Sequence, residues 1–130
     1  MRFLLDTHIL IDMADGVTAT LDRIAPIPLV DLAMAAISAA ELEASIFADP
    51  EWQAQREPPT RAILNAVTVV PFDAATARRY GEIVAACGYN RRKAVDRLIA
   101  ATAIAQGLIL VTRNASDFSD IPSLVIEDWA

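Results

Sequence analysis

The sequence predicts an α/β domain built on a mostly parallel sheet of five strands. Five short apolar segments alternate with segments that have helical spacing, and this alternation is typical of strand–helix–strand units. Acidic residues also follow several of the predicted strands, as expected where a site forms at the carboxyl ends of parallel strands. The 130 residues contain no repeat or flexible linker, so residues 1–130 are interpreted as one domain.

The amino-terminal segment is predicted to be a strand followed by two short helices. Residues 2–5 are apolar and stop at Asp6, which favours a short buried strand. Residues 9–14 have helical spacing and are closed by Gly16, and a second helix over residues 17–24 ends before two prolines.

A second strand and a longer helix are expected next. Residues 33–37 are apolar and predict a buried strand. A helix begins at Ser38, because Ser38 and Glu41 have the spacing of a capping box. Residues 49–60 contain three prolines and several charges, which indicates an exposed loop, and a short helix follows over residues 61–66.

The middle of the chain carries the clearest helix signals. Residues 67–72 are rich in β-branched side chains and predict a strand. Asp73 begins a helix with an apolar stripe that ends at Gly88. Residues 94–106 form the strongest helical pattern of the chain, followed directly by Gly107.

Two more strands are predicted near the carboxyl end. Residues 90–93 are interpreted as a basic loop before the long helix. Residues 108–111 are continuously apolar and predict a buried strand, and residues 124–126 a last short one. The polar residues 112–120 between them are interpreted as a loop.

The composition excludes several classes of protein. A hydrophobic fraction of 55% excludes disorder, and the longest uncharged stretch, residues 98–112, is shorter than the ~18–20 residues that span a membrane. The apolar start stops at Asp6, so we expect no signal peptide and a cytoplasmic protein. Cys87 and His8 are the only residues of their types, which excludes an internal disulfide and Cys- or His-rich metal sites.

The charge is unevenly distributed along the chain. Eleven basic and 17 acidic side chains give a net charge of −6, which by itself argues against a nucleic-acid partner. Residues 78–97, however, are locally basic and form either a solvated helix face or a strip that contacts a polyanion backbone. Arg113 either binds a phosphate or pairs with Asp117 or Asp120. The candidate nucleic-acid contacts are Arg91, Arg92, Lys93, Arg97 and Arg113.

Four acidic residues are the candidate site. Asp6 follows the first strand, Glu41 lies one turn into the helix after the second, and Asp117 lies in the loop after residues 108–111. Asp96 begins the long helix among apolar neighbours. Clustered carboxylates repel one another unless a cation is present, and Mg²⁺ prefers oxygen ligands. One or two such ions would activate water for phosphodiester hydrolysis.

Each of the four acids also has a structural explanation. Glu41 completes the capping box, Asp96 interacts favourably with a helix N-terminus, and Asp117 is a turn residue. Asp6 at the end of a buried strand is hardest to explain in this way.

The motifs together resemble those of the PIN-domain ribonucleases, and especially the VapC toxins of toxin–antitoxin pairs. The matching motifs are LLDTHIL at residues 4–10, SAAEL at 38–42, DRLIAATA at 96–103, and LVTRN at 110–114 with DF at 117–118. The resemblance implies a single PIN-like domain, with helices on both faces of a five-stranded parallel sheet. It also implies Mg²⁺- or Mn²⁺-dependent cleavage of RNA, with one or two ions bound.

The resemblance also implies roles for individual residues. Asp6 and Asp96 are expected to bind metal directly, and Glu41 and Asp117 directly or through water. The residues expected to orient the acids are Thr7, Thr112 and Asn114.

Two positions depart from the commonest family pattern. His8 stands where the family often has Asn, and its role is either a phosphate contact or proton shuttle, or capping and packing. Asn114 stands where some relatives carry an acid, which lowers the charge available for a second metal ion.

Partners are implied by the resemblance alone. They are an RNA substrate, a second copy of the chain in a homodimer, and an antitoxin that places a basic side chain in the acidic pocket. Operator DNA would be bound through the antitoxin, and no membrane is involved. The alternative interpretation is a catalytically silent PIN-like module that binds RNA or a protein.

Overall fold

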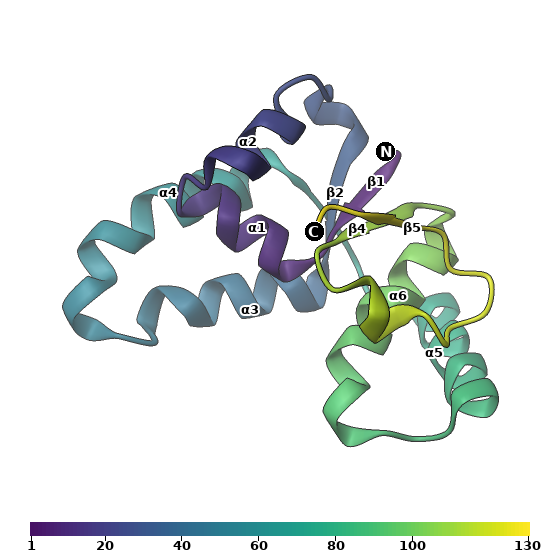
Figure 1. The fold of residues 1–130 in the computed structure, drawn as a ribbon. Coiled ribbons are helices and arrows are strands. Elements are labelled where there is room, and N and C mark those ends of the chain that lie inside the picture. Colours follow the sequence, from purple (N-terminus) through teal and green to yellow (C-terminus); the bar gives the residue numbers. More distant parts are fainter.

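Five parallel strands form the single sheet of the computed structural model, which describes residues 1–130 (Figure 1). The strand order across the sheet is β3-β2-β1-β4-β5, and every neighbouring pair is parallel. The strands are β1 (Phe3–Leu5), β2 (Leu32–Ala35), β3 (Thr68–Val70), β4 (Ile109–Thr112) and β5 (Ile126–Asp128). The predicted α/β class is therefore confirmed.

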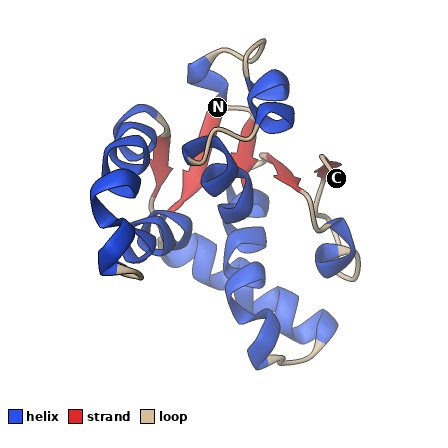
Figure 2. Cartoon of the chain, turned by 60° about the vertical axis from the view of Figure 1, so that its left-hand side comes forward, coloured by secondary structure: helices blue, strands red, loops and turns tan.

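Six helices cover both faces of this sheet, as the resemblance implied (Figure 2). They are α1 (Thr7–Ala14), α2 (Thr18–Ile24), α3 (Ala36–Phe47), α4 (Gln53–Ala66), α5 (Ala74–Cys87) and α6 (Ala94–Gln106). Four short 3₁₀ turns lie between them: η1 (Leu29–Asp31), η2 (Pro50–Trp52), η3 (Arg91–Lys93) and η4 (Ala115–Phe118). No helix combines the length and the hydropathy needed to cross a bilayer.

The core consists of one apolar cluster on each face of the sheet. Successive side chains of a strand point to opposite faces. Leu4 of β1 and Leu110 of β4 therefore lie in the cluster covered by α5 and α6. Phe3, Leu5 and Val111 lie in the other cluster, which includes side chains of α1, α3 and α4.

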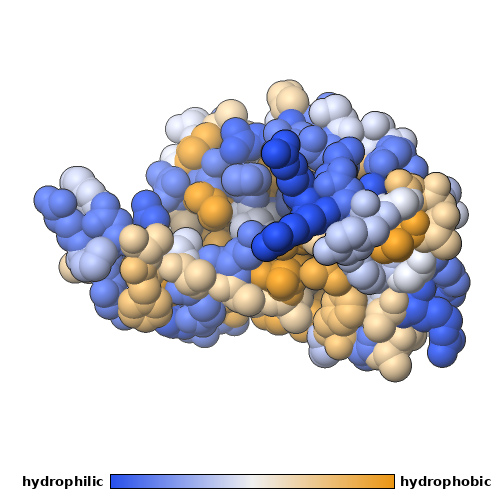
Figure 3. All heavy atoms as spheres, turned by 90° about the horizontal axis from the view of Figure 1, so that it is seen from below, coloured by the Kyte–Doolittle hydropathy of each residue, from blue (hydrophilic) through white to orange (hydrophobic).

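The strand order changes direction at β1 and β4, so a switch point lies at their carboxyl ends. The chain adds β2 and β3 on one side of β1 and then crosses to add β4 and β5 on the other. Such a switch point is where open α/β sheets usually place a site. The α3–α4 and α5–α6 pairs extend as two arms on either side of this edge (Figure 1). Viewed from below, the surface between the arms carries both hydrophilic and hydrophobic side chains (Figure 3).

The predicted capping box at Ser38 is wrong. Helix α3 begins at Ala36. Strand β2 therefore ends at Ala35, two residues before the end that was predicted for it. Ala35 is the N-cap of the helix and makes no side-chain hydrogen bond. Ser38 lies inside the helix, fully buried, and its hydroxyl contacts Thr7. This distant partner in α1 takes the place of the local cap.

The predicted loop over residues 49–60 is also wrong. It consists mostly of η2 and the first half of α4, which contains Pro58 and Pro59 beyond its first turn. Prolines there remove backbone hydrogen bonds, which is why the sequence favoured a loop. Contacts with α3 compensate for this, because Arg56 donates to the Ser45 carbonyl and Arg61 pairs with Glu43 at 2.5 Å.

The second half of the chain follows the prediction more closely. Asp73 caps α5 by accepting a hydrogen bond from the Thr76 amide, and α6 has the predicted bounds. Gly107 ends α6 with φ +65°, a conformation that favours glycine. Strand β5 lies two residues later than predicted, and the loops at residues 90–93 and 112–120 contain η3 and η4.

Candidate active site

Asp6 is held rigidly at the carboxyl end of β1. Its side chain is 4% exposed, and its backbone amide donates to the Val111 carbonyl of β4. One carboxylate oxygen accepts from the Thr7 amide at 2.9 Å, which caps α1, and the other accepts from Thr112 Oγ1 at 2.7 Å. Both oxygens are therefore oriented by neighbouring elements, and Thr112 makes the contact that its predicted role requires.

Glu41 reaches the same region from α3. Its Oε1 accepts a hydrogen bond of 2.7 Å from Thr7 Oγ1, which shares a second hydrogen bond of 2.9 Å with Ser38 Oγ. Thr7 thus contacts Asp6 through its backbone and Glu41 through its side chain. The residue links the first two acids of the candidate site.

Asp96 lies near the other three acids of the candidate site. Its pKa is raised to about 6, mainly because partial burial at the start of α6 disfavours the charged form, and also because of the charges of Asp6, Asp117 and Glu41, in that order. The charge of His8 acts in the opposite direction. The other three acids and His8 therefore lie close enough to Asp96 for their charges to affect its pKa.

The donor set fits a hard divalent cation bound with few direct ligands. The structure brings no three Asp, Glu, His or Cys side chains close enough to hold one metal ion among them. Mg²⁺ usually takes only one or two carboxylates and keeps several waters, so this spacing remains compatible with such an ion. The mutual repulsion at Asp96 would be relieved by a bound cation.

Asn114 and His8 lie at the margin of the site. The Asn114 amide donates to Thr112 Oγ1 at 3.0 Å, so its backbone rather than its side chain supports the Asp6 contact. The Asn114 side chain is exposed and lines a cavity with Asp12 and Arg113. His8 is exposed in the first turn of α1, so its side chain is accessible to a ligand.

One predicted nucleic-acid contact needs correction, and so does the pairing considered for Arg113. Arg97 is only 3% exposed and donates to the Gly88 carbonyl, so it cannot contact a bound polyanion. Arg113 pairs with Asp12 at 3.0 Å, and with neither of the acids considered for it. By contrast, Arg91 and Arg92 are exposed in η3, and Lys93 is half-buried.

Asp12 is a residue that the sequence analysis missed. It is 8% exposed on α1, accepts from Thr20 Oγ1 at 3.3 Å and pairs with Arg113. The sequence did contain a signal for its burial. Residues three apart lie on the same face of a helix, so Asp12 shares the buried face of α1 with Ile9. Its partner Arg113 is distant in the sequence, so the pair itself could not be predicted.

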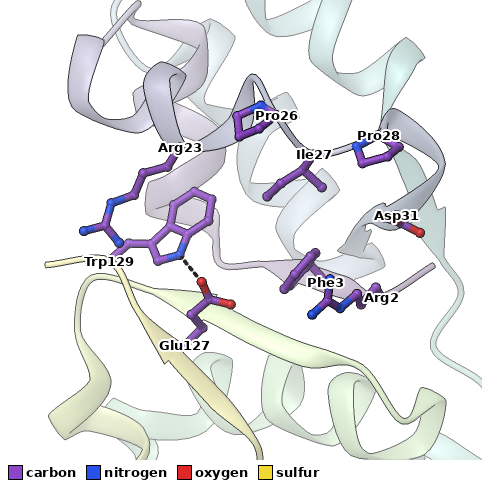
Figure 4. Close-up of a pocket in the computed structure, with 9 residues that line it drawn as sticks. All are labelled: Arg2, Phe3, Arg23, Pro26, Ile27, Pro28, Asp31, Glu127 and Trp129. Atoms are coloured by element: carbon purple, nitrogen blue, oxygen red, sulfur yellow. Dashed lines mark hydrogen bonds between the residues drawn. The ribbon is translucent and has the colours of Figure 1, made fainter.

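A large surface cavity lies apart from the acids. Its volume is about 490 Å³, and its lining includes Phe3, Arg23 and Trp129, but none of the four acids (Figure 4). The Trp129 indole donates to Glu127 at 3.0 Å, and the Arg23 guanidinium lies 5.7 Å from the centre of the Trp129 ring. The charged chemistry of the acids, rather than the size of a cavity, therefore identifies the candidate site.

Thr112→Val is expected to weaken the site without unfolding the protein. The substitution keeps the shape of the side chain and removes the hydroxyl that donates to Asp6. Loss of such an orienting partner typically lowers metal affinity or activity ~10–100-fold. Thr102→Val is the matched control, because the Thr102 hydroxyl is equally buried but bonds only to Leu98 of its own helix. Mn²⁺ titration of both variants measures the effect, and equal affinities would contradict it.

Comparisons with known proteins agree with this geometry. A family model described as "PIN domain" matches residues 3–124. The chain is 35% identical over 69 residues to the tRNA(fMet)-specific endonuclease VapC of Shigella flexneri, a match covering 52% of each chain, so it spans about half the length of that relative. It is 30% identical over 105 residues to ribonuclease VapC2 of Rickettsia felis, with 75% of this chain and 74% of the relative covered.

A solved structure matches over the whole chain. It is VapBC2 from Rickettsia felis bound to a DNA fragment from their promoter, with a TM-score of 0.85, 25% identity and complete coverage of both chains. The arrangement of helices around the sheet is thus shared along the full length of the fold.

Proposed function

This chain belongs to the PIN-domain family, and from that premise we propose that it is a metal-dependent endoribonuclease, the toxin of a toxin–antitoxin pair. The observation that carries the proposal is the hydrogen-bond network through which Thr7 and Thr112 hold Asp6 and Glu41 at the carboxyl end of β1, and the raised pKa of Asp96 nearby is consistent with it. Four mutually repelling carboxylates at the switch point of a parallel sheet are suited to binding a divalent cation beside a phosphodiester.

The residues of the chain have distinct roles in this proposal. Asp6 and Asp96 would hold Mg²⁺ or Mn²⁺ directly, and Glu41 and Asp117 directly or through water. Once bound, the ion supplies Lewis-acid activation of the attacking water and neutralises charge on the phosphodiester.

Orientation of the acids precedes binding of the ion. Thr112 and the Thr7 amide hold both oxygens of Asp6, and the Thr7 hydroxyl holds Glu41. Because these donors fix the carboxylates, little rearrangement of the acids would be needed when an ion binds.

The negative charge of the chain is compatible with an RNA substrate. Part of the acid excess lies in the proposed metal site, where bound divalent ions reverse the local charge. Exposed Arg91 and Arg92, with half-buried Lys93, lie in η3 directly before α6, which carries Asp96. These side chains would contact the RNA backbone beside the cleaved bond.

We further propose an antitoxin as a protein partner and a homodimer as the assembly. The solved relative from Rickettsia felis is a VapBC2 complex bound to a DNA fragment from their promoter, which supports the antitoxin partner. A basic antitoxin side chain would compete with the metal for the four carboxylates. Binding of operator DNA would then occur through the antitoxin.

Asp6→Asn is expected to abolish cleavage of RNA while the protein stays folded. The amide keeps the size of the side chain but removes the charge that would bind the cation. The assay combines purified protein with RNA, including tRNA(fMet) because a relative is named for it, in Mg²⁺ or Mn²⁺ and in EDTA. Asp22→Asn on α2 is the control, because Asp22 is exposed and is not one of the four acids.

Three results would decide between the alternatives. Cleavage by the wild-type chain only with a divalent ion supports the proposal. Full activity in EDTA would overturn the metal mechanism. Binding of RNA without cleavage in any divalent ion would instead support a catalytically silent PIN-like module.

A further inference from the structure

Arg97 is a buried cation that the proposed reaction does not use. It lies in the second turn of α6, directly after Asp96, and its side chain is almost completely buried. Arginine is rarely buried without a partner, and a cation near a helix N-terminus is electrostatically unfavourable. Its Nε is the one buried side-chain nitrogen or oxygen without a hydrogen-bond partner. Burial of this charged side chain is energetically unfavourable, so packing alone does not explain it.

The two ends of the Arg97 guanidinium contact two different loops. Nη1 donates to the carbonyl of Gly88, the glycine with φ +79° that ends α5. Nη2 donates to Asp120 Oδ2 at 3.4 Å, just after η4. Arg97 therefore connects the start of α6 with the end of α5 and with the segment that carries Asp117.

A second contact closes the same cluster. Cys87 Sγ donates to the backbone carbonyl of Asp120 at 3.2 Å, so the end of α5 also contacts this segment directly. Phe118 and Ile121, on either side of Asp120, are buried in the core, which leaves the Asp120 side chain as the polar connection to Arg97.

We propose that Arg97 is a positioning residue that fixes the spacing between Asp96 and Asp117. Asp96 precedes Arg97 in the rigid first turns of α6, and Asp117 lies three residues before Asp120. The Arg97 guanidinium binds one acceptor at the end of α5 and another just after η4. These two contacts together fix the distance of both segments from α6, and one contact alone could not do this. The contact with Gly88 holds the basic η3 residues through the same side chain. The expected effect of Arg97 on catalysis rests on the proposed function, whereas its expected effect on the structure does not.

Arg97→Met and Asp120→Ala separate the two contacts. Arg97→Met loses both of them, so we expect the half-saturating Mn²⁺ concentration to rise about tenfold and kcat to fall ~10–100-fold, with a raised KM for RNA because η3 is also released. Asp120→Ala removes the acceptor of Nη2 and keeps the Gly88 contact, so its metal dependence and kcat should change in the same direction by a smaller factor, with KM unchanged. Arg97→Lys retains the charge but reaches one acceptor, and should recover part of the loss.

Amide chemical shifts give a measurement independent of activity. In ¹H–¹⁵N spectra of the folded protein, both variants should shift residues 115–120, and only Arg97→Met should also shift residues 88–93. The double variant should resemble Arg97→Met alone, because the two side chains act through one contact. Arg56→Met is the matched control: Arg56 also donates to a backbone carbonyl of another helix, that of Ser45, but away from the acids.

The possible outcomes are distinguishable. Wild-type Mn²⁺ dependence and unchanged shifts at residues 115–120 in folded Arg97→Met would overturn the positioning role. If Arg97→Met does not fold, Asp120→Ala decides: a folded variant with altered shifts and metal dependence supports the proposal, and one identical to the wild type overturns it. Failure of the wild-type chain to cleave RNA would overturn the proposed function, while the amide shifts would still test the position of Asp117.

Discussion

Asp96→Asn is expected to abolish RNA cleavage and, in the absence of metal, to make the protein more stable. Loss of a direct metal ligand should lower activity by more than the ~100-fold typical of an outer partner. The gain in stability has a separate cause, because the Asp96 carboxylate is half-buried and repelled by Asp6, Asp117 and Glu41.

The pH dependence follows from the direction of the Asp96 pKa shift. The folded-state pKa of about 6 lies above the ordinary value of 3.8, so the folded protein binds the proton more tightly. The resulting stabilisation is fully present below pH 3.8 and is lost as the pH rises through about 6. At pH 7.5 the charged carboxylate destabilises the fold by about 1 kcal/mol, after a reduction for solvent screening at a half-exposed group.

Thermal unfolding in EDTA at pH 5 and pH 7.5 measures this difference. Asp96→Asn should unfold a few degrees above the wild type at pH 7.5, and the difference should shrink at pH 5. Asp22→Asn, at an exposed site on α2, should show neither effect. A variant that is less stable than the wild type at pH 7.5 would show that Asp96 is not under electrostatic strain.

Phe118→Ala is expected to have the largest effect on stability. Phe118 ends η4 and is 1% exposed within the cluster between the sheet and helices α5 and α6. Truncation of a buried phenylalanine typically destabilises a protein by ~3–5 kcal/mol, because a cavity remains. For a domain of this size the midpoint of thermal unfolding should fall by roughly 10–20 °C.

Phe118→Ala should also reduce RNA cleavage at temperatures where the variant is still folded. The reason is that the buried ring next to Asp117, which holds η4 in the core, is lost. Phe47→Ala is the matched control: Phe47 is 54% exposed at the end of α3, so its truncation should change stability by no more than about 0.5 kcal/mol. Equal losses in the two variants would contradict the role given to the buried ring.

Local signals explain what the sequence could predict. Asp73, Gly88 and Gly107 mark the ends of α5 and α6 by hydrogen bonding and backbone conformation within a few residues, and both helices were predicted closely. Asp6, Glu41 and Asp117 could be predicted as a group because they follow parallel strands, whose carboxyl ends meet at one edge of the sheet, whereas Asp96 begins a helix and was included for its apolar neighbours.

Distant contacts explain what the sequence could not predict. Helix α4 contains Pro58 and Pro59, and its contacts with α3 offset the backbone hydrogen bonds that these prolines remove. The burial of Arg97 depends on Asp120 and Gly88, which are remote from it along the chain. The prolines of residues 49–60 favour an exposed loop, and the charge of Arg97 favours exposure to solvent. Tertiary contacts outweigh both of these local preferences.

The pairing of β1 with β4 has a consequence for the time at which the protein gains its site during synthesis. Asp6 is translated about a hundred residues before Val111 and Thr112, which hold its backbone and side chain, and Asp117 follows later still. A ribosome-bound chain that lacks these residues has an incomplete central sheet and only part of the acid cluster. The arrangement delays assembly of the site until β4 and η4 have left the ribosome.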